Sequence, residues 1–441
     1  MTARPVRRDT NPGVTRRKTL AVGLGNFLEF YNFLVFSTFA PMIGHSLLPQ
    51  GGAASQSVVA WSAFAISFIA RPLGAVALGR VAERRGRRLA LLASLGLMGL
   101  GSAMVAFCPG YGRIGWIATA ITIAGRLLQG FSDGGEVGPA SVALFDIAPP
   151  GRRMGLVLLQ FITQNAAATT GVCVGLVLSA WLSEAALYAW GWRVALAAGL
   201  AIVPFGLWLR RGLDVGETVG RSAAESETRL DARHALVLCT MLGTTSMAYG
   251  RAYGVTYGIT VLRMHPRAAM AAMALGLASS VVGMIAGLIL TRRLGARTLT
   301  IVALLGSMLI CEPLYAWAAA DRSWGVLAIA QSLIGLVGAM PFAPLLLAML
   351  TAFAPAERAT GFGLVYALAV ATCGATTPAL LSWLNAFDGN PLWPAHVYVV
   401  ASAIALAGGL ALLARSTDPE LAPATPLTSA SATAAGRQAG G

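Results

Sequence analysis

The residues best placed to do chemistry are four polar side chains within one long apolar segment: Arg126, Gln129, Asp133 and Glu136. At 100° per residue they fall within a sector of about 80° on a helix, so all four face the same way. A charge at bilayer depth costs roughly 2.5–3.5 kcal/mol unless it is paired or faces water. Three charges on one stripe therefore indicate a functional site inside a membrane.

A second buried acid, Glu29, lies about ten residues, or roughly 15 Å, into the first apolar segment. Asn26 and Asn32 are its neighbours on that helix, and Asn32 is a further candidate for substrate binding. A pair between Glu29 and Arg126, or between Asp133 and Arg126, would cancel the buried charge. Protonation of the acid would then release the arginine, which links a proton to a conformational change. The alternative is a permanent ion pair that locks two helices together.

Arg251 is the candidate for binding a substrate, because it lies about halfway along the seventh apolar segment with no acid in that segment. Tyr249 and Tyr253 flank it. A guanidinium that faces a water-filled cavity, with hydroxyls nearby, binds a carboxylate through two parallel hydrogen bonds. The sequence therefore favours an organic anion over a sugar or a cation. The alternative is that Arg251 pairs with Glu312 or with an acid earlier in the chain.

Three amides, Gln160, Gln164 and Asn165, form a patch on the fifth apolar segment and are further candidates for substrate binding. Hydrogen bonding between helices is the alternative for them. Arg71 is expected near the cytoplasmic end of the second segment, as an anchor or as a vestibule contact. The four histidines lack metal spacing, so neither a metal nor a cofactor is expected.

These residues are positioned by apolar segments that recur along the whole chain. Of 441 residues, 56% are hydrophobic and 11% are charged, against roughly 25% charged residues in soluble domains. Twelve runs can cross a bilayer as helices. They lie near 19–44, 57–79, 88–108, 115–145, 154–181, 190–210, 235–262, 269–290, 298–320, 324–350, 361–384 and 393–414. The second, fourth and tenth runs contain internal Pro or Gly pairs. The sequence predicts an all-α membrane protein with twelve transmembrane helices.

The net charge of +14 reports orientation rather than nucleic-acid binding. Of the 32 Arg and Lys residues, 24 precede the first span, follow the last span or lie in the even-numbered loops. By the positive-inside rule, both termini are cytoplasmic.

The chain divides into two six-helix halves. We expect a cytoplasmic N-terminal tail (1–18), a first half (19–210), a polar cytoplasmic linker (211–233), a second half (234–414) and a disordered C-terminal tail (415–441). An Ala-Pro-x-x-Arg-x-x-Gly pattern precedes the fifth span and recurs 206 residues later, before the eleventh span. Two such halves with a site between them at the bilayer midplane are typical of alternating-access carriers.

The loop between the second and third spans resembles the signature loop of the major facilitator superfamily. Its pattern is carried by Gly79, Glu83, Arg84, Gly86, Arg87 and Arg88, with Glu83 where the family has Asp. Such an acid can cap a helix of the other half and so hold one gating state; a plain anchoring loop is the alternative. Asp146 and Arg152 are assigned to the same gate. In the second half Arg292 stands at the acid's position, so only the first half is expected to form the gate fully.

Further motifs resemble the metabolite:proton symporter family within that superfamily. They begin at Gly25 in span one, Arg71 in span two, Arg126 in span four and Gly191 at span six, and they cover the chain well to about residue 215. The span-one motif, the Pro109-Gly110-Tyr111 loop and the three amides are similar to the citrate and tricarballylate branch. The resemblance implies a monomeric carrier in the bacterial inner membrane that imports a tri- or dicarboxylate with protons.

Two positions depart from this family. The family usually has Asp where this chain has Asn32, and a small residue where it has Asp133. We hypothesise that the titrating group has moved from span one to Asp133. The alternatives are a proton-independent facilitator and an exporter of a small metabolite. Against a drug exporter, Gly175 in span five is followed by Leu176 and not by proline. No nucleophile–base cluster suggests an enzyme.

Overall fold

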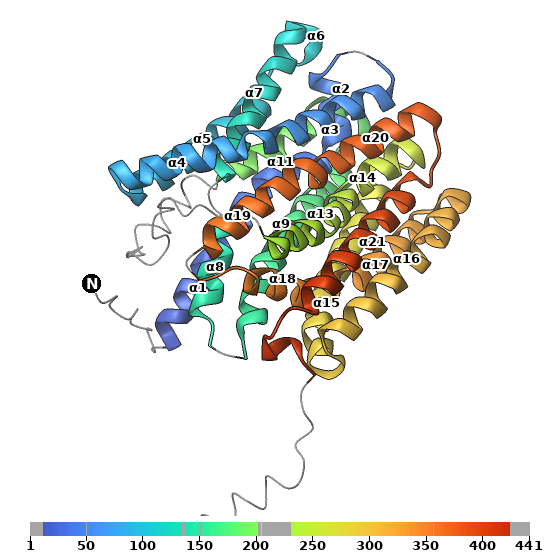
Figure 1. Ribbon diagram of the computed structural model, residues 1–441. Coiled ribbons are helices and arrows are strands. Elements are labelled where there is room, and N and C mark those ends of the chain that lie inside the picture. Colours follow the sequence, from blue (N-terminus) through green and yellow to red (C-terminus); the bar gives the residue numbers. More distant parts are fainter. Residues whose placement is uncertain are drawn as a thin grey trace, which may run out of the picture.

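The computed structural model describes residues 12–49, 51–134, 137–149, 151–201, 204, 231–355 and 357–423. Within these ranges every regular element is helical. The helices form two groups that follow the two halves of the sequence, drawn blue to green and yellow to red in Figure 1. Helices α9 and α13, one from each half, lie near the centre of the molecule.

The first half is built from the following helices: α1 (Pro12–Thr38), α2 (Ala40–Leu47), α3 (Ala53–Ile69), α4 (Arg71–Arg85), α5 (Arg87–Ala106), α6 (Tyr111–Ile114), α7 (Trp116–Asp133), α8 (Val137–Ile147), α9 (Arg153–Trp181), α10 (Glu184–Ala186), η1 (Leu187–Gly191) and α11 (Trp192–Gly199). Taken with their breaks, they correspond to the first six predicted spans.

The second half repeats this plan: α13 (Ala232–Ala252), α14 (Gly254–Thr256), η2 (Tyr257–Val261), α15 (Pro266–Leu294), α16 (Ala296–Asp321), α17 (Trp324–Ala339), α18 (Phe342–Thr351), α19 (Arg358–Ala369), η3 (Val370–Gly374), α20 (Thr376–Asp388), α21 (Trp393–Leu413) and η4 (Pro419–Leu421). Of the described helices, seven are long and apolar enough to cross a membrane, or eight with α1 and α2 counted as one span bent by 67°.

Several spans, including some of these seven, are interrupted helices. The second, fourth and tenth spans break at residue 70, after residue 133 and at residues 340–341, where the sequence has internal Gly or Pro. Short π-helical turns interrupt the sixth, seventh and eleventh spans (η1, η2 and η3). In a bundle, neighbouring helices satisfy the backbone groups that such breaks release.

The loops after the second and the eighth spans share one backbone conformation, which supports an internal duplication. Gly86 precedes α5 with φ of 91° and ψ of 149°, and Gly295 precedes α16 with φ of 78° and ψ of 153°. A positive φ of this size favours glycine, because a Cβ atom would be strained there.

Close contact between the second and fourth spans brings their buried charges together. A Cβ atom on Gly130 would overlap the carbonyl oxygen of Ser67, and one on Gly134 would overlap that of Arg71. The absence of side chains at these glycines lets α7 lie directly against α3 and α4. As a result, Asp133 on α7 meets Arg71 at the start of α4.

The carboxylate of Glu420, in the short η4 turn after α21, joins the two halves at the cytoplasmic face. Glu420 accepts hydrogen bonds from the backbone N–H groups of Gly151 at 2.8 Å, Arg153 at 3.2 Å and Met154 at 3.2 Å. These groups belong to the start of α9, so Glu420 of η4 caps a first-half helix. Arg292 donates to the carbonyl oxygen of Gly151 at 3.2 Å. The second half therefore supplies an acid to this face although its loop has none.

Other contacts between the halves lie at both ends of the molecule. On the cytoplasmic side Arg358 lies 3.6 Å from Asp146, and on the other side Trp61 donates to Thr256 at 3.1 Å. The tail was expected to begin at residue 415, and its first residues include the η4 turn; residues 424–441, the N-terminal segment before Pro12 and nearly all of the 211–233 linker lie outside the described residues.

Candidate functional site

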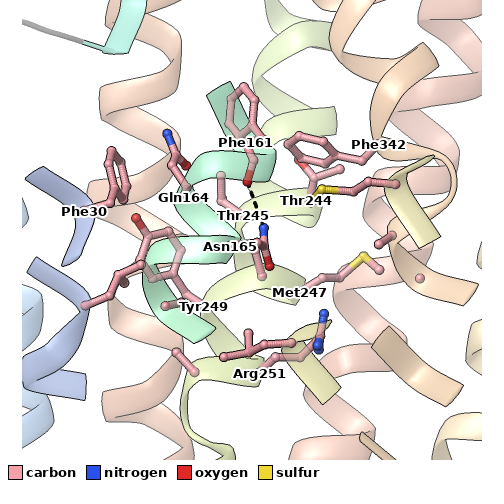
Figure 2. Close-up of a pocket in the computed structure, with 18 of the residues that line it drawn as sticks. Phe30, Phe161, Gln164, Asn165, Thr244, Thr245, Met247, Tyr249, Arg251 and Phe342 are labelled. Atoms are coloured by element: carbon pink, nitrogen blue, oxygen red, sulfur yellow. Dashed lines mark hydrogen bonds between the residues drawn. The ribbon is translucent and has the colours of Figure 1, made fainter. Parts of the chain in front are cut away.

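A cavity of about 160 Å³ lies between the two halves, among α1 and α9 of the first half and α13, α15–α19 and α21 of the second. Most of its lining is apolar, with a small number of polar groups, as is usual for sites that bind small molecules. Figure 2 shows the main polar side chains: Gln164, Asn165, Thr244, Thr245, Tyr249 and Arg251.

The helix that carries Arg251 begins at a well-formed cap. Asp231 accepts hydrogen bonds from the backbone N–H groups of Arg233 at 2.8 Å and His234 at 3.1 Å, and the His234 side chain completes a capping box. The His234 backbone hydrogen bond lowers the pKa of the Asp231 carboxyl. From this fixed start α13 runs inward for 21 residues, and its last turn brings Arg251 into the cavity wall.

Arg251 is the cation of the cavity. It is 9% exposed, and one terminal nitrogen donates to the carbonyl oxygen of Gly276 at 2.9 Å, while its Nε has no hydrogen-bond partner. Among the residues that the structure describes, no carboxylate lies within 4 Å of it. The alternative pairing with Glu312 is wrong, because Glu312 is largely exposed on α16 and lies 3.9 Å from His396. Its positive charge therefore remains available to an anion.

The three amides of α9 divide between two environments. Gln164 and Asn165 line the cavity. Gln160 does not: its side chain accepts from Ser141 of α8 at 2.7 Å and is buried between helices. Asn26 connects the first span to this region, donating to the carbonyl oxygen of Gln160 at 2.9 Å. For Gln160 the contacts match the alternative of hydrogen bonding between helices.

The two tyrosines beside Arg251 also differ. Tyr249 lines the cavity, whereas Tyr253 is 1% exposed and packs against Trp61 at 6.1 Å between ring centroids. The turn of helix between them explains this, since residues four apart lie one above the other and not at the same depth. Tyr253 contributes to the contact between the halves at the end opposite the cytoplasmic face.

Arg126 lies in a cage of aromatic rings away from the cavity. Its guanidinium is 4.5 Å from the ring centroids of Phe33 and Phe36 and 5.0 Å from that of Phe64. It donates to Gln129 at 2.6 Å and to Ser67 at 3.3 Å. Aromatic faces attract a desolvated cation by about 2 kcal/mol. This cage replaces an acid as the environment of Arg126.

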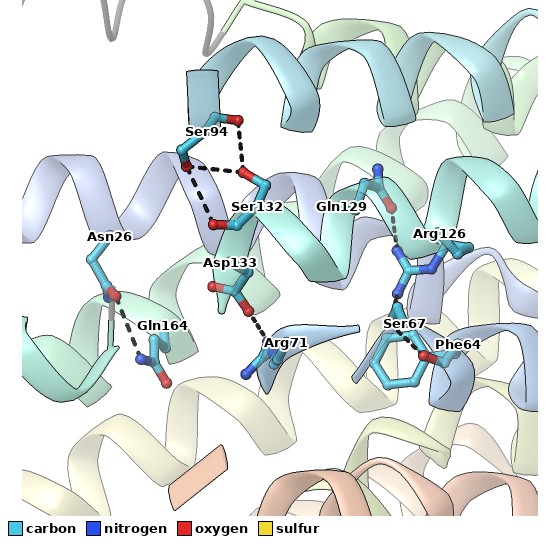
Figure 3. Close-up of polar contacts among 10 residues, drawn as sticks. All are labelled: Asn26, Phe64, Ser67, Arg71, Ser94, Arg126, Gln129, Ser132, Asp133 and Gln164. Carbon is cyan, nitrogen blue, oxygen red and sulfur yellow. Dashed lines mark hydrogen bonds and ion pairs between the residues drawn. The ribbon is translucent and has the colours of Figure 1, made fainter. Parts of the chain in front are cut away.

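Asp133 pairs with Arg71, and not with Arg126 as the sequence suggested (Figure 3). Arg126 and Asp133 are seven residues apart on α7, about 10 Å along its axis. Arg71 is nearer because α4 lies directly against α7 at Gly134. Both partners are buried, with side-chain exposures of 2% and 1%. Arg71, expected near the cytoplasmic end, lies near the middle of the second span.

Asn32 belongs to a neutral hydrogen-bond chain that ends at Arg126. Its amide donates to the carbonyl oxygen of Gly199 at 2.7 Å and accepts from Ser102 at 3.2 Å. Ser102 in turn accepts from Gln129 at 2.8 Å. Asn32 is fully buried and does not line the cavity. An ionised carboxylate could not donate to Gly199, so this position suits an amide or a protonated acid.

The remaining candidates are only partly described. Glu29 is 8% exposed on α1 and has polar interactions of its own, but Arg126 contacts Gln129 and Ser67 and not Glu29. Glu136 and the side chains of Glu83, Arg87 and Arg88 lie outside the described residues. In the loop itself Gly79, Arg84 and Gly86 are exposed, as is Arg152 at the start of α9. Asp146 lies 3.6 Å from Arg358 of the other half.

Two tyrosines of the cavity were not predicted from the sequence. Tyr366 of α19 and Tyr398 of α21 line it, and Tyr398 lies close enough to Arg251 to interact with its charge. Each is an isolated tyrosine in an apolar span with no charged neighbour. The only available signal was a single hydroxyl in the middle of a predicted span.

Comparison with known proteins gives one family match and several relatives. The model of the Major Facilitator Superfamily matches residues 22–320. The citrate-proton symporter of Salmonella typhi is 30% identical over 408 residues, which cover 90% of this chain and 93% of that protein. The citrate-proton symporter of Klebsiella pneumoniae is 31% identical over 413 residues, covering 89% and 90%. These matches extend through both halves, further than the motifs, which fade after about residue 215.

Two other matches are narrower in what they show. The alpha-ketoglutarate permease of Escherichia coli strain K12 is 35% identical over 203 residues, covering 45% of this chain and 47% of that protein. A partially occluded inward-open conformation of the xylose transporter XylE from E. coli superposes with a TM-score of 0.70 and 16% identity, covering 92% of this chain and 99% of that chain. At this identity the likeness shows the twelve-helix fold alone.

Proposed function

The chain belongs to the major facilitator superfamily, and we propose that it imports an organic anion with two or three carboxylates together with protons. It is a multi-pass protein, which we place in the bacterial inner membrane as a monomer. Two relatives that are similar over nearly the whole chain are named citrate-proton symporters. The relatives are carriers, and the site carries out binding and movement of a solute rather than a reaction.

The observation that carries this proposal is Arg251. A buried guanidinium is costly unless something neutralises it, and among the described residues no acid does so. A carboxylate entering the cavity would form charge-assisted hydrogen bonds to it. Gln164 and Asn165 of α9 and Tyr249 of α13 are neutral donors that line the same cavity and suit the remaining oxygens of such an anion.

Asp133 is the residue we assign to proton coupling. It is buried, its charge is held by Arg71, and its Oδ1 has no hydrogen-bond partner among the described atoms. Protonation would neutralise Asp133 and leave Arg71 without a counter-charge, which changes the contact between α4 and α7. The neutral chain around Asn32 supports the hypothesis that titration has moved away from span one. The same chain is also what a proton-independent facilitator would show.

Uptake of labelled citrate into proteoliposomes separates these possibilities. With an acidic exterior, the wild type should accumulate citrate above the external concentration, and collapse of the pH gradient should abolish accumulation. Asp133→Asn should equilibrate citrate without accumulating it. Undiminished accumulation by Asp133→Asn would refute the assignment of coupling to Asp133. If imposed gradients do not affect the wild type, the protein is a facilitator.

A further inference from the structure

Arg71 is held at its place by a single charged partner. Among the described residues Asp133 is its one carboxylate, and its Nε has no hydrogen-bond partner. The rest of its environment is aromatic, with the ring centroids of Phe68 and Phe33 at 4.2 and 5.1 Å. Loss of the Asp133 charge would therefore leave a buried guanidinium without a counter-ion.

Two tyrosines of the cavity wall connect the cavity with Arg71. Tyr249 of α13 and Tyr366 of α19 both line the cavity, and both interact electrostatically with Arg71. Tyr249 also packs edge-on against Phe68, at 5.4 Å between ring centroids. Tyr249 and Tyr366 thus contact both Arg71 and the space where a substrate would bind.

One arginine is a poor match for an anion with several carboxylates. Arg251 can bind one carboxylate bidentately, and the other polar groups of the cavity in Figure 2 are neutral amides and hydroxyls. Arg126 is enclosed by Phe33, Phe36 and Phe64 and does not line the cavity. Arg71 does not line the cavity either, but it interacts with two cavity tyrosines, Tyr249 and Tyr366, whereas Arg126 interacts with Tyr249 only.

We propose that Arg71 is the second carboxylate-binding residue of this cavity, held back by ionised Asp133 and released toward the substrate when Asp133 takes up a proton. The inference rests on the proposed function and deepens it. Proton and anion then bind together, because each favours the state in which the Arg71–Asp133 pair is open. By reciprocity, the bound anion also increases the affinity of Asp133 for a proton.

The groups around Asp133 are consistent with this linkage. Arg71 faces it from α4, and Arg126 lies two turns away on α7 itself. From α5, Ser94 forms a hydrogen bond with Ser132, the residue before Asp133, at 3.0 Å. Tyr249 and Tyr366 face Arg71 from α13 and α19. In the described part of the chain, no second acid near Asp133 is paired with Arg71.

The competing explanation is an ion pair that only fixes α4 against α7. The two explanations differ in sign. If the pair is purely structural, Asp133→Asn leaves a buried unpaired cation, and citrate affinity falls or is unchanged. If Arg71 is withheld from the substrate, Asp133→Asn imitates the protonated state, and citrate affinity rises.

The test is citrate binding to the purified full-length protein by isothermal titration calorimetry at pH 8. Comparison at one pH keeps the ionisation of citrate the same for every variant. We expect Asp133→Asn to bind citrate at least about fivefold more tightly than the wild type. The double variant Asp133→Asn/Arg71→Gln should lose this gain. Equal or weaker binding by folded Asp133→Asn, or a gain that persists in the double variant, would overturn the inference.

A second variant covers the case in which Asp133→Asn does not fold. Arg71→Lys keeps the charge and the ion pair but loses the planar fork that binds a carboxylate bidentately. At pH 6 its citrate affinity should be about three- to tenfold lower than that of the wild type. Unchanged affinity would overturn the inference. If the wild type binds neither citrate nor a shorter dicarboxylate at either pH, the proposed function itself fails.

Discussion

Arg126 in the first half and Arg251 in the second are both buried arginines with no carboxylate partner in the described parts of the chain, yet their surroundings are opposite. Three phenylalanine rings and the Gln129 amide enclose Arg126. Arg251 donates to one backbone carbonyl, lies near the hydroxyls of Tyr398 and Tyr315, and lines the cavity. Burial of a charge thus marks both residues as important, but only the space in front of the charge distinguishes a ligand site from a structural one.

The two halves also differ in how their buried charges at the proposed site are balanced. In the first half Arg71 and Asp133 cancel, and a neutral chain of hydrogen bonds runs from Asn32 to Arg126. In the second half the Arg251 charge is left uncompensated. This asymmetry suits a symporter in which one half carries the proton and the other attracts the anion, with the cavity between them.

The largest expected effect belongs to Arg251. Loss of a buried charge-assisted contact costs about 2–5 kcal/mol, so Arg251→Gln should weaken citrate binding by roughly 30- to several-thousand-fold. Arg251→Lys should recover part of this loss, because it keeps the charge without the bidentate geometry. Binding calorimetry measures both variants. The matched control is Arg322→Gln, which changes an exposed arginine directly after the last residue of α16. This variant should bind citrate like the wild type. Wild-type affinity in Arg251→Gln would remove the distinction between the two arginines.

A smaller effect of a different kind is expected at Arg126. Arg126→Met removes the cation from its aromatic cage and leaves Gln129 without its partner, which should cost about 2–4 kcal/mol of folding stability. The melting temperature should fall by several degrees, while the citrate dissociation constant of the folded protein changes less than about threefold. A large loss of affinity with an unchanged melting temperature would show that Arg126, too, serves the ligand.

The smallest effect concerns Asn32, where Asn32→Asp gives the first-half network an acid. The new carboxyl can donate to the carbonyl oxygen of Gly199 only while it is protonated. The unfolded chain ionises it at ordinary acidic pH, so stability should fall as pH rises, by about 1–3 kcal/mol between pH 5 and pH 8. Melting curves at several pH values, with the wild type as reference, measure this slope. A slope equal to that of the wild type would mean that the network accepts a charge at position 32.

Much of the architecture follows from the sequence, because apolar length, loop charge and Gly or Pro breaks are local properties. Local properties predict where the spans lie and where they break, at residues 70 and 340–341. They also predict that Arg126, Gln129 and Asp133 are buried on one side of their helix. The partner of Asp133 is not local. It depends on where α4 crosses α7, which is set by contacts of Gly130 and Gly134 with another helix. The same holds for Gln160 and Gln164, neighbours on one helix that face different environments.

The Glu420 contact at the start of α9 has a consequence for how the two halves have diverged. Its three hydrogen bonds join residues that are 266 to 269 positions apart, and they require only that a carboxylate reach the helix end. The start of α9 therefore has a carboxylate cap although the second-half loop holds Arg292 and no acid at the corresponding position. The two halves of a carrier can thus make equivalent contacts with residues that stand at non-equivalent positions in the sequence.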